Sequence, residues 1–343
     1  MKGKVFLFCL LAAALTILLT PLAKRIAINM GAMDAPSKRK VHTVPMPRMG
    51  GLAIYLSFWI TVFASQTASK EVMAFFIGSL FILVSGIWDD CRNISPKMKL
   101  LFQAAAALTV IFGGITVDFL SNPFGKELLF LEWMSYPVTF LWIIGMTNAV
   151  NLIDGLDGLA AGTSAIASCA IGVVALMNGQ IIMSSLAFIL AASTFGFLKY
   201  NFHPASIFMG DTGALFLGYA LAVLSLMGMT KTATTVAFFL PIIILEVPIF
   251  DTLFAIVRRA SNDKPIFSAD KDHLHHRLLA MGLSHTQAVL LVYGICLFLS
   301  ISAICISLLP ENIDIIGGIF VTLLMAFGAA KTGLLGNKKK ESK

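Results

Sequence analysis

The sequence predicts an all-α, polytopic membrane protein. Hydrophobic residues make up 58% of its 343 residues, whereas charged residues make up only 13%. A typical soluble domain is about one-quarter charged, so this composition excludes an ordinary soluble fold. The apolar residues also occur in runs of roughly 20, the length of a helix that crosses a bilayer. Most of the charged residues lie in short connections between these runs, which is the pattern of membrane topology.

About eleven apolar runs are long enough to be predicted as membrane spans. The first is expected to stay in the protein, because the run continues past the alanines at 12–14 and ends at Lys24. Pro241 and Pro248 predict that the ninth span is kinked or broken. We expect one integral membrane domain over residues 1–330 and a basic cytoplasmic tail over residues 331–343. The predicted spans are 5–23, 50–66, 72–88, 100–117, 136–150, 159–177, 181–198, 214–229, 233–250, 286–309 and 313–330.

Lysine and arginine are distributed unequally between the two sides of the predicted membrane. If the connection after the first span faces the cytoplasm, twenty of the 25 basic residues lie on the cytoplasmic side. This bias predicts an N-terminus outside the cell and a C-terminus in the cytoplasm. The net charge of +7 therefore reflects topology, and nucleic acid is not an expected partner. The basic residues predicted on the outer side are Lys2, Lys4, Lys70, Lys126 and Lys231.

The segment Asn-Leu-Ile-Asp-Gly-Leu-Asp-Gly at 151–158 puts two carboxylates, one carboxamide and two glycines into eight residues between long apolar runs. Asp154 and Asp157 are three residues apart, so they share one face of a helical turn, and Asn151 adds a carboxamide. Charged residues at membrane depth usually line a wet cavity or meet a cation. The simpler alternative is a capped, solvated loop between two spans. Other polar clusters on the same predicted side favour a shared cytoplasmic site.

Three further carboxylates lie in other connections predicted to be cytoplasmic. Asp89 and Asp90 end the third span, and Asp211 stands in Met-Gly-Asp-Thr-Gly at the head of the eighth. Neighbouring residues do not share a helix face, so Asp89 and Asp90 are expected to meet different partners. At Asp211, the helix start would offer backbone N–H groups to phosphate and a carboxylate to a metal. The alternatives are solvated acids at 89–90 and a helix N-cap at 211.

These five carboxylates together predict a Mg²⁺ site, with Mn²⁺ as a second candidate, because hard divalent cations prefer oxygen ligands. Mg²⁺ usually takes only one or two protein carboxylates and completes its coordination with water and phosphate oxygens. The other acids must therefore serve as a base, orient a ligand, or contact a sugar or nucleobase.

Cationic side chains in the same connections could bind phosphate. The run His-Leu-His-His-Arg at 273–277 contains three imidazoles and one guanidinium, and arginine binds phosphate through a bidentate fork. A zinc site is the competing interpretation, but no cysteine or matching histidine cluster lies on the same predicted face. Single cations elsewhere could instead extend to the interface. The candidate phosphate-binding residues are His42, Arg48, Lys99, His275, His276 and Arg277.

Carboxylates, a divalent metal and cationic groups at a membrane surface indicate phosphoryl transfer, which depends on positioning and charge neutralisation. The sequence lacks the Gly-x-x-x-x-Gly-Lys-Ser/Thr motif of an ATP-driven pump. An ion-coupled transporter would place its acids in the middle of spans, often within an inverted repeat. The acids here lie at span ends on one side, and no repeat is detected.

The chain resembles the polyprenyl-phosphate N-acetylhexosamine-1-phosphate transferases along nearly its whole length. His-x-His-His-Arg is similar to the branch that uses UDP-N-acetylglucosamine (UDP-GlcNAc), whereas the phospho-N-acetylmuramoyl-pentapeptide branch usually carries a His-His-His run and is the alternative. Within the first branch, the motifs are most similar to those of the enzymes that start wall teichoic acid synthesis. The motifs that carry the resemblance are 39–42, 45–51, 89–90, 151–158, 201–204, 208–213 and 273–278.

The resemblance implies a Mg²⁺-dependent transfer of GlcNAc-1-phosphate from UDP-GlcNAc to undecaprenyl phosphate at the bacterial cytoplasmic membrane, with release of UMP. It implies that Asp211 binds the metal, and that the catalytic residues are Asp89, Asp90, Asp154 and Asp157. A kinked ninth span would admit the lipid tail. The sequence does not set the oligomeric state, and a homodimer is among the assemblies it allows. The implied substrate-binding residues are His42, Arg48, Lys99, Asn151, Asn201, His275, His276 and Arg277.

Overall fold

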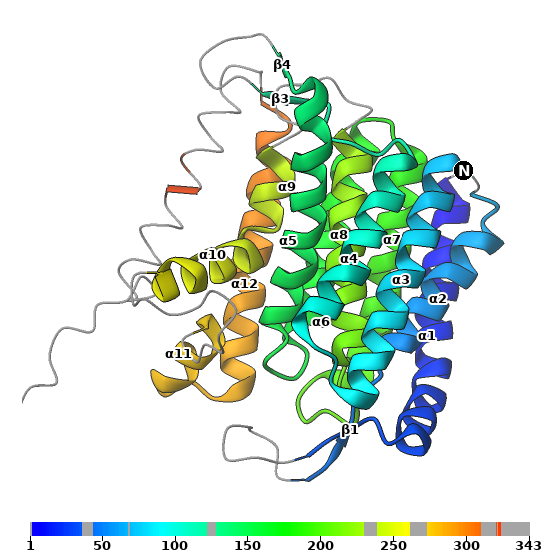
Figure 1. Cartoon of the computed structure of the whole chain (residues 1–343), viewed down its shortest axis with the longest axis vertical. Coiled ribbons are helices and arrows are strands. Elements are labelled where there is room, and N and C mark those ends of the chain that lie inside the picture. The colour runs from blue at the N-terminus through cyan, green and yellow to red at the C-terminus, as the bar shows by residue number, and fades with distance from the viewer. Residues whose placement is uncertain are drawn as a thin grey trace, which may run out of the picture.

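The protein is a bundle of long α-helices whose axes run roughly in one direction (Figure 1). The computed structural model describes residues 2–35, 44–67, 69–121, 128–229, 239–260, 273–309, 320 and 322–323. His42, the predicted tail and nearly all of the predicted eleventh span lie outside these residues.

The described residues form twelve α-helices, one short 3₁₀ helix and two small antiparallel hairpins. The helices are α1 (Lys2–Met30), α2 (Gly51–Ala64), α3 (Lys70–Arg92), α4 (Pro96–Phe112), α5 (Ser135–Ile153), α6 (Leu159–Met177), α7 (Ile181–Asn201), α8 (Gly210–Met229), α9 (Phe239–Ile244), α10 (Glu246–Ala260), α11 (Leu274–Ala280) and α12 (His285–Ile306). The 3₁₀ helix is Glu132–Met134, and the strands are β1 (Met33–Asp34), β2 (Met46–Pro47), β3 (Phe119–Ser121) and β4 (Leu128–Phe130). Strand β1 pairs with β2, and β3 pairs with β4.

Seven of the described helices, α1, α3, α5, α6, α7, α8 and α12, are long and apolar enough to cross a membrane. Helix α2 is apolar but shorter. These findings confirm an all-α polytopic membrane protein. The ninth predicted span is two helices, because α9 ends at Ile244 and α10 begins at Glu246, so the predicted break is confirmed. Helix α10 lies across the direction of the bundle in Figure 1.

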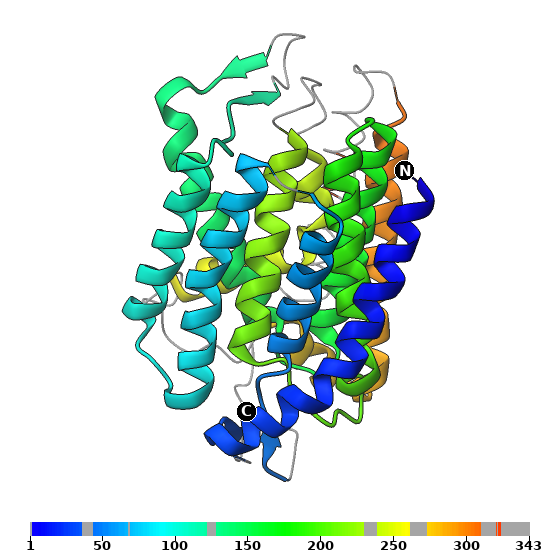
Figure 2. The same ribbon diagram turned by 90° about the vertical axis from the view of Figure 1, so that its right-hand side faces the viewer.

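Helix α8 is the centre of the bundle and is buried along nearly all of its length. It packs against α3 and α5 and also contacts α2, α6 and α7. Helix α1 lies at the edge of the bundle (Figure 2) and exposes apolar side chains such as Leu7, Leu18 and Leu22. A helix that is apolar on its outer surface is stable in lipid, so this gradient from α8 to α1 fits a membrane-embedded bundle.

The polar motifs gather at one end of the bundle, the lower end in Figure 1. Helices α3 and α5 end there, and α4, α6, α8 and α12 begin there. The hairpin of β3 and β4 lies at the opposite end.

Candidate active site

Asp89 and Asp90 end α3 and meet different partners, as expected for neighbours on a helix. Asp90 is 2% exposed, and its Oδ1 accepts a hydrogen bond from the backbone N–H of Asp211 (2.9 Å). Its Oδ2 accepts from the backbone N–H (3.0 Å) and the hydroxyl (2.6 Å) of Thr212. Asp90 therefore caps α8 from a neighbouring helix. These two N–H groups are not free to bind phosphate, and the Asp211 carboxylate is not the N-cap.

Asp89 and Asp211 converge on one ammonium group. Lys99 Nζ lies 2.9 Å from Asp89 Oδ2 and also contacts Asp211 Oδ2. The local sequence explains where Lys99 lies: Asn93 ends α3 in the left-handed conformation (φ 49°), and the side chain of Ser95 caps the start of α4. This tight turn directs the first turn of α4 back toward the end of α3.

Glycines allow the backbones of these helices to approach closely. A Cβ at Gly86, one turn before Asp89, would lie 2.4 Å from Thr212 Cα. A Cβ at Gly210 would lie 2.6 Å from Asp90 Oδ2, and its backbone has a φ of +71°, which favours glycine. The close contact between α3 and α8, and with it the placement of the carboxylates, therefore requires glycine at these two positions.

The loop 154–158 joins α5 to α6 and brings Asp154 toward the same acids. Burial, followed by the negative charges of Asp211, Asp90 and Asp157, raises the pKa of Asp154 to about 8. At neutral pH, the Asp154 carboxyl therefore keeps its proton when no cation is near. A Cβ at Gly155 would lie 2.2 Å from His275 Nε2, so this loop lies directly against α11.

Asp157 and Asn201 hold the same loop to the segment after α7. Asp157 Oδ2 accepts hydrogen bonds from the backbone N–H of Ala205 (3.1 Å) and pairs with His203 Nδ1 (2.8 Å). The buried Asn201 side chain accepts from the backbone N–H of Gly158 (3.1 Å) and donates to the backbone carbonyl of residue 207 (3.1 Å). The Asn201 amide thus has a structural partner at each end, and its binding of substrate stays a prediction.

The histidine motif is anchored by a residue that the sequence did not single out. Asp251 on α10 is buried; its Oδ2 pairs with His273 Nδ1 (2.8 Å), and its Oδ1 accepts from the backbone N–H of Leu274 (2.8 Å). Burial, followed by the neighbouring His276 imidazole, lowers the pKa of His275 to about 4. His275 is therefore neutral at pH 7 and can donate or accept a hydrogen bond but adds no positive charge.

Arg48 is used mainly to hold the end of α3. Its guanidinium donates to the backbone carbonyls of Asp90 and Asp89 (3.2 Å each) and to the side chain of Asn93 (2.7 Å). Arg48 also forms a parallel bridge with Phe208, which joins the segment before α2 to the segment before α8. Phosphate binding by Arg48 stays a prediction.

The structure thus brings most of the predicted site residues to one end of the bundle. Asp89, Asp90, Lys99 and Asp211 form direct contacts. Asn151 lies in the last turn of α5, and His276 and Arg277 lie on α11. The sequence did not predict the role of Asp251 or the pairing of His203 with Asp157. An acid within the apolar stretch 239–257 was the available signal for Asp251.

Comparisons with known proteins identify relatives that match most of this chain. The sequence profile of glycosyl transferase family 4 matches residues 72–229. A probable undecaprenyl-phosphate N-acetylglucosaminyl 1-phosphate transferase of Bacillus subtilis is 49% identical over 96% of this chain and 93% of its own length. A decaprenyl-phosphate N-acetylglucosaminephosphotransferase of Mycobacterium leprae is 34% identical over 91% and 87%. An undecaprenyl-phosphate alpha-N-acetylglucosaminyl 1-phosphate transferase of Escherichia coli K12 is 26% identical over 79% and 75%.

Proposed function

The chain belongs to glycosyl transferase family 4, and from that premise we propose that it transfers GlcNAc-1-phosphate from UDP-GlcNAc to undecaprenyl phosphate. The products are undecaprenyl-diphosphate-GlcNAc and UMP, and the reaction is the first membrane step of wall teichoic acid or a related cell-surface polysaccharide. The names of relatives that match most of the chain support this assignment over the muramoyl-pentapeptide branch.

The convergence of Asp89 and Asp211 on one cation is the observation that carries the proposal. Two carboxylates from different helices meet the Lys99 ammonium, so the fold already directs negative charge at a single point. Such an oxygen-rich pair fits Mg²⁺ or Mn²⁺ better than zinc. We assign Asp211 as a metal ligand with Asp89 beside it. The bound metal would neutralise the diphosphate of UDP-GlcNAc.

The protein's own residues would mainly position the two phosphates. A phosphate monoester has a second pKa near 6, so the lipid phosphate is already ionised at pH 7 and needs no strong base. One of its oxygens bonds to the β-phosphorus of UDP-GlcNAc, and the bond from that phosphorus to the bridging oxygen breaks. UMP leaves with the bridging oxygen. Lys99, His276 and Arg277 would hold phosphate oxygens, and neutral His275 would hydrogen-bond them.

The acids of the loop between α5 and α6 would help to bind and orient the nucleotide sugar. Burial, followed by the charges of Asp211 and Asp90, raises the pKa of Asp154, so a cation bound at Asp211 would favour the ionised form, which can accept hydrogen bonds from the nucleotide sugar. Asp157 holds the following segment in place through His203 and Ala205. Asn151, in the last turn of α5, would contact the nucleotide.

We place this end of the bundle at the inner leaflet of the bacterial cytoplasmic membrane, with the N-terminus outside. The positive-inside bias supports this orientation. The break between α9 and α10 would admit the isoprenoid tail from the lipid while its phosphate meets the soluble nucleotide. We also propose that the chain crosses the membrane about eleven times, that its basic C-terminal tail lies in the cytoplasm, and that a homodimer is a possible assembly.

The decisive assay measures UMP release from UDP-GlcNAc with undecaprenyl phosphate and Mg²⁺, with and without chelator. We expect full dependence on lipid and metal, and little turnover when UDP-MurNAc-pentapeptide replaces UDP-GlcNAc. Asp211→Asn should lower turnover by about a thousandfold, the scale of losing a main electrostatic group, while the protein stays folded. Asp118→Asn, an acid beside the hairpin at the opposite end, is the matched control. Chelator-resistant activity or a fully active Asp211→Asn variant would refute the metal assignment.

An ion-coupled transporter would be the alternative from another class. Its coupling acids would lie within the span interiors. Asp89, Asp90, Asp154 and Asp211 all lie at helix ends at one end of the bundle, which does not favour transport.

A further inference from the structure

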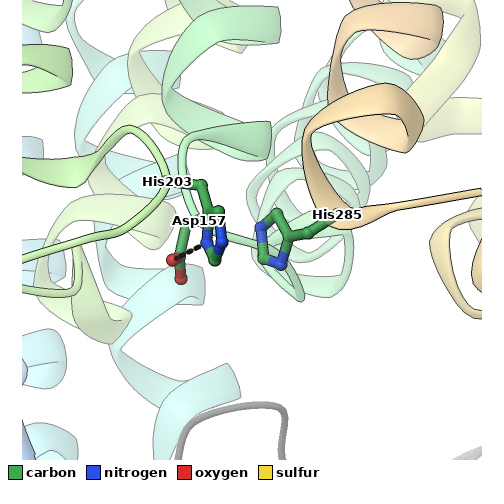
Figure 3. A group of neighbouring side chains, drawn as sticks. All are labelled: Asp157, His203 and His285. Carbon is green, nitrogen blue, oxygen red and sulfur yellow. Dashed lines mark hydrogen bonds and ion pairs between the residues drawn. The ribbon is translucent and has the colours of Figure 1, made fainter.

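Asp157, His203 and His285 form a cluster beside the carboxylate site, and each comes from a different part of the chain (Figure 3). Asp157 precedes α6, His203 follows α7, and His285 is the first residue of α12. One ligand atom from each residue lies within 4.8 Å of the others. We propose that these three residues bind a transition-metal dication such as Zn²⁺, at a site separate from Asp211.

The kinds of ligand favour this class of ion. Two imidazoles and one carboxylate suit Zn²⁺, Co²⁺ or Fe²⁺, whereas Mg²⁺ prefers oxygen ligands alone. Three protein ligands also leave coordination positions open for water or a substrate oxygen. The histidine motif at 273–277 is a poorer candidate, because among the described residues it does not bring three such ligand atoms within 4.8 Å of one another.

The imidazole of His285 supports the proposal independently. Both of its ring nitrogens are shielded from solvent and make no hydrogen bond of good geometry with the described residues; the nearby backbone of Asp157 offers only a weak one. Polar atoms in this condition cost free energy unless a partner is supplied. The capping box of Ser284 and Gln287 fixes the start of α12, so the backbone of His285 is held in place while its ring nitrogens make no hydrogen bond of good geometry.

Ion binding requires a defined rearrangement. The rings of His203 and His285 are stacked, with centroids 4.2 Å apart and planes 17° from parallel. The lone pair of an imidazole nitrogen lies in the ring plane, so two stacked rings cannot both direct nitrogens at one ion. The His285 ring would turn about its side-chain bonds toward Asp157, and the hydrogen bond of His203 Nδ1 to Asp157 (2.8 Å) would give way to two metal bonds.

A bound ion would join α12 to the α5–α6 loop. The Tyr293 hydroxyl of α12 already donates to the backbone carbonyl of Gly158, so α12 and this loop are close without the ion. Because the site uses Asp157, it would also be sensitive to UDP-GlcNAc. The metal site rests on these contacts and would stand if the proposed reaction were wrong.

The test titrates Co²⁺ and then Zn²⁺ into untagged, full-length protein in detergent, with excess Mg²⁺ to saturate the Asp211 site. We expect one Co²⁺ per chain, visible d–d absorption, and loss of that absorption when Zn²⁺ displaces Co²⁺. His285→Ala and His203→Ala should each weaken binding by about tenfold or more. His276→Ala is the matched control and should bind normally. Thermal unfolding without metal checks that each variant is folded.

Two results would overturn the inference: no Co²⁺ binding by the wild-type protein, or binding that survives both His285→Ala and His203→Ala. Loss of binding in His276→Ala alone would move the site to the histidine motif and also overturn it. UMP release by the same samples is measured in parallel. Active protein that binds no Co²⁺ refutes this site alone, whereas inactive protein that binds Co²⁺ refutes the proposed reaction alone.

Discussion

The two halves of the candidate active site are built differently. The carboxylate half lies on α3, α4 and α8, where long helices touch at glycines and each of Asp89, Asp90 and Asp211 has a close partner. The histidine half lies on the short helix α11, which Asp251 ties to α10 through two hydrogen bonds. A rigid half suits cation binding, where small displacements are costly. A half carried by one short helix can shift more easily as a substrate enters and leaves.

After the Asp211→Asn change described above, the next largest effect is expected when the ammonium of the rigid half is removed. Lys99→Met should lower UMP release by about a hundredfold or more, because a cation that would hold phosphate is lost. The same change should tighten metal binding, since Lys99 competes with the metal for Asp89 and Asp211. Mn²⁺ binding measured by electron paramagnetic resonance checks this. Weaker Mn²⁺ binding in the variant would show that Lys99 supports the ion.

The packing of the rigid half can be tested at a single glycine. Gly86→Ala places a Cβ 2.4 Å from Thr212 Cα, so the helices must separate at a cost of about 1–3 kcal/mol. We expect a lower melting temperature and a marked loss of activity. Gly145→Ala on α5 is the matched control, because a Cβ there meets nothing within 4 Å. Equal melting temperatures for the two variants would contradict the argument.

A substitution in the histidine half should lower activity less than a substitution in the rigid half. Asp251→Asn weakens hydrogen bonds to an ionised group, which are each worth about 1.5–3 kcal/mol, and should raise the KM for UDP-GlcNAc about tenfold with a smaller change in kcat. The anchor acts through His273, so adding His273→Ala should have little further effect. Additive effects of the two changes on KM would show that Asp251 acts independently of the motif.

The last prediction concerns the pH dependence of stability rather than catalysis. The pKa of Asp154 is about 8 in the folded protein, whereas an unfolded aspartate titrates near 4. As pH rises from about 5 to about 8, the unfolded chain has already lost this proton and the folded protein has kept it, so metal-free protein becomes less stable. Asp154→Asn should flatten this decline in melting temperature. An unchanged slope would place the titrating group elsewhere.

The sequence was sufficient to predict the helical class and the clustering of acids, because apolar runs and their polar ends are local patterns. It also predicted the break near Pro241 and Pro248, since proline removes a helical hydrogen bond. It predicted that Asp89 and Asp90 meet different partners but could not identify those partners, because they depend on how α3 lies against α8. Asp251 was missed for a similar reason. The predicted span ended at residue 250, whereas α10 continues to Ala260.

Some predicted ligands turned out to have structural partners. Arg48 binds the end of α3, and Asn201 joins two backbone segments. Motif spacing alone cannot separate a residue that binds a substrate from one that shapes the pocket, because both must lie at the same end of the bundle.

The cap that Asp90 provides for α8 has a consequence for the order in which ligands arrive. The positive end of the α8 dipole would otherwise attract an anion, but here two N–H groups at that end already donate to the Asp90 side chain from α3, and Asp89 and Asp211 lie beside it. A free nucleotide diphosphate approaching this helix would therefore meet like charge. We therefore expect an ordered binding of ligands: the nucleotide binds either as its complex with the cation or after the cation has bound. UDP-GlcNAc without a metal ion should bind only weakly.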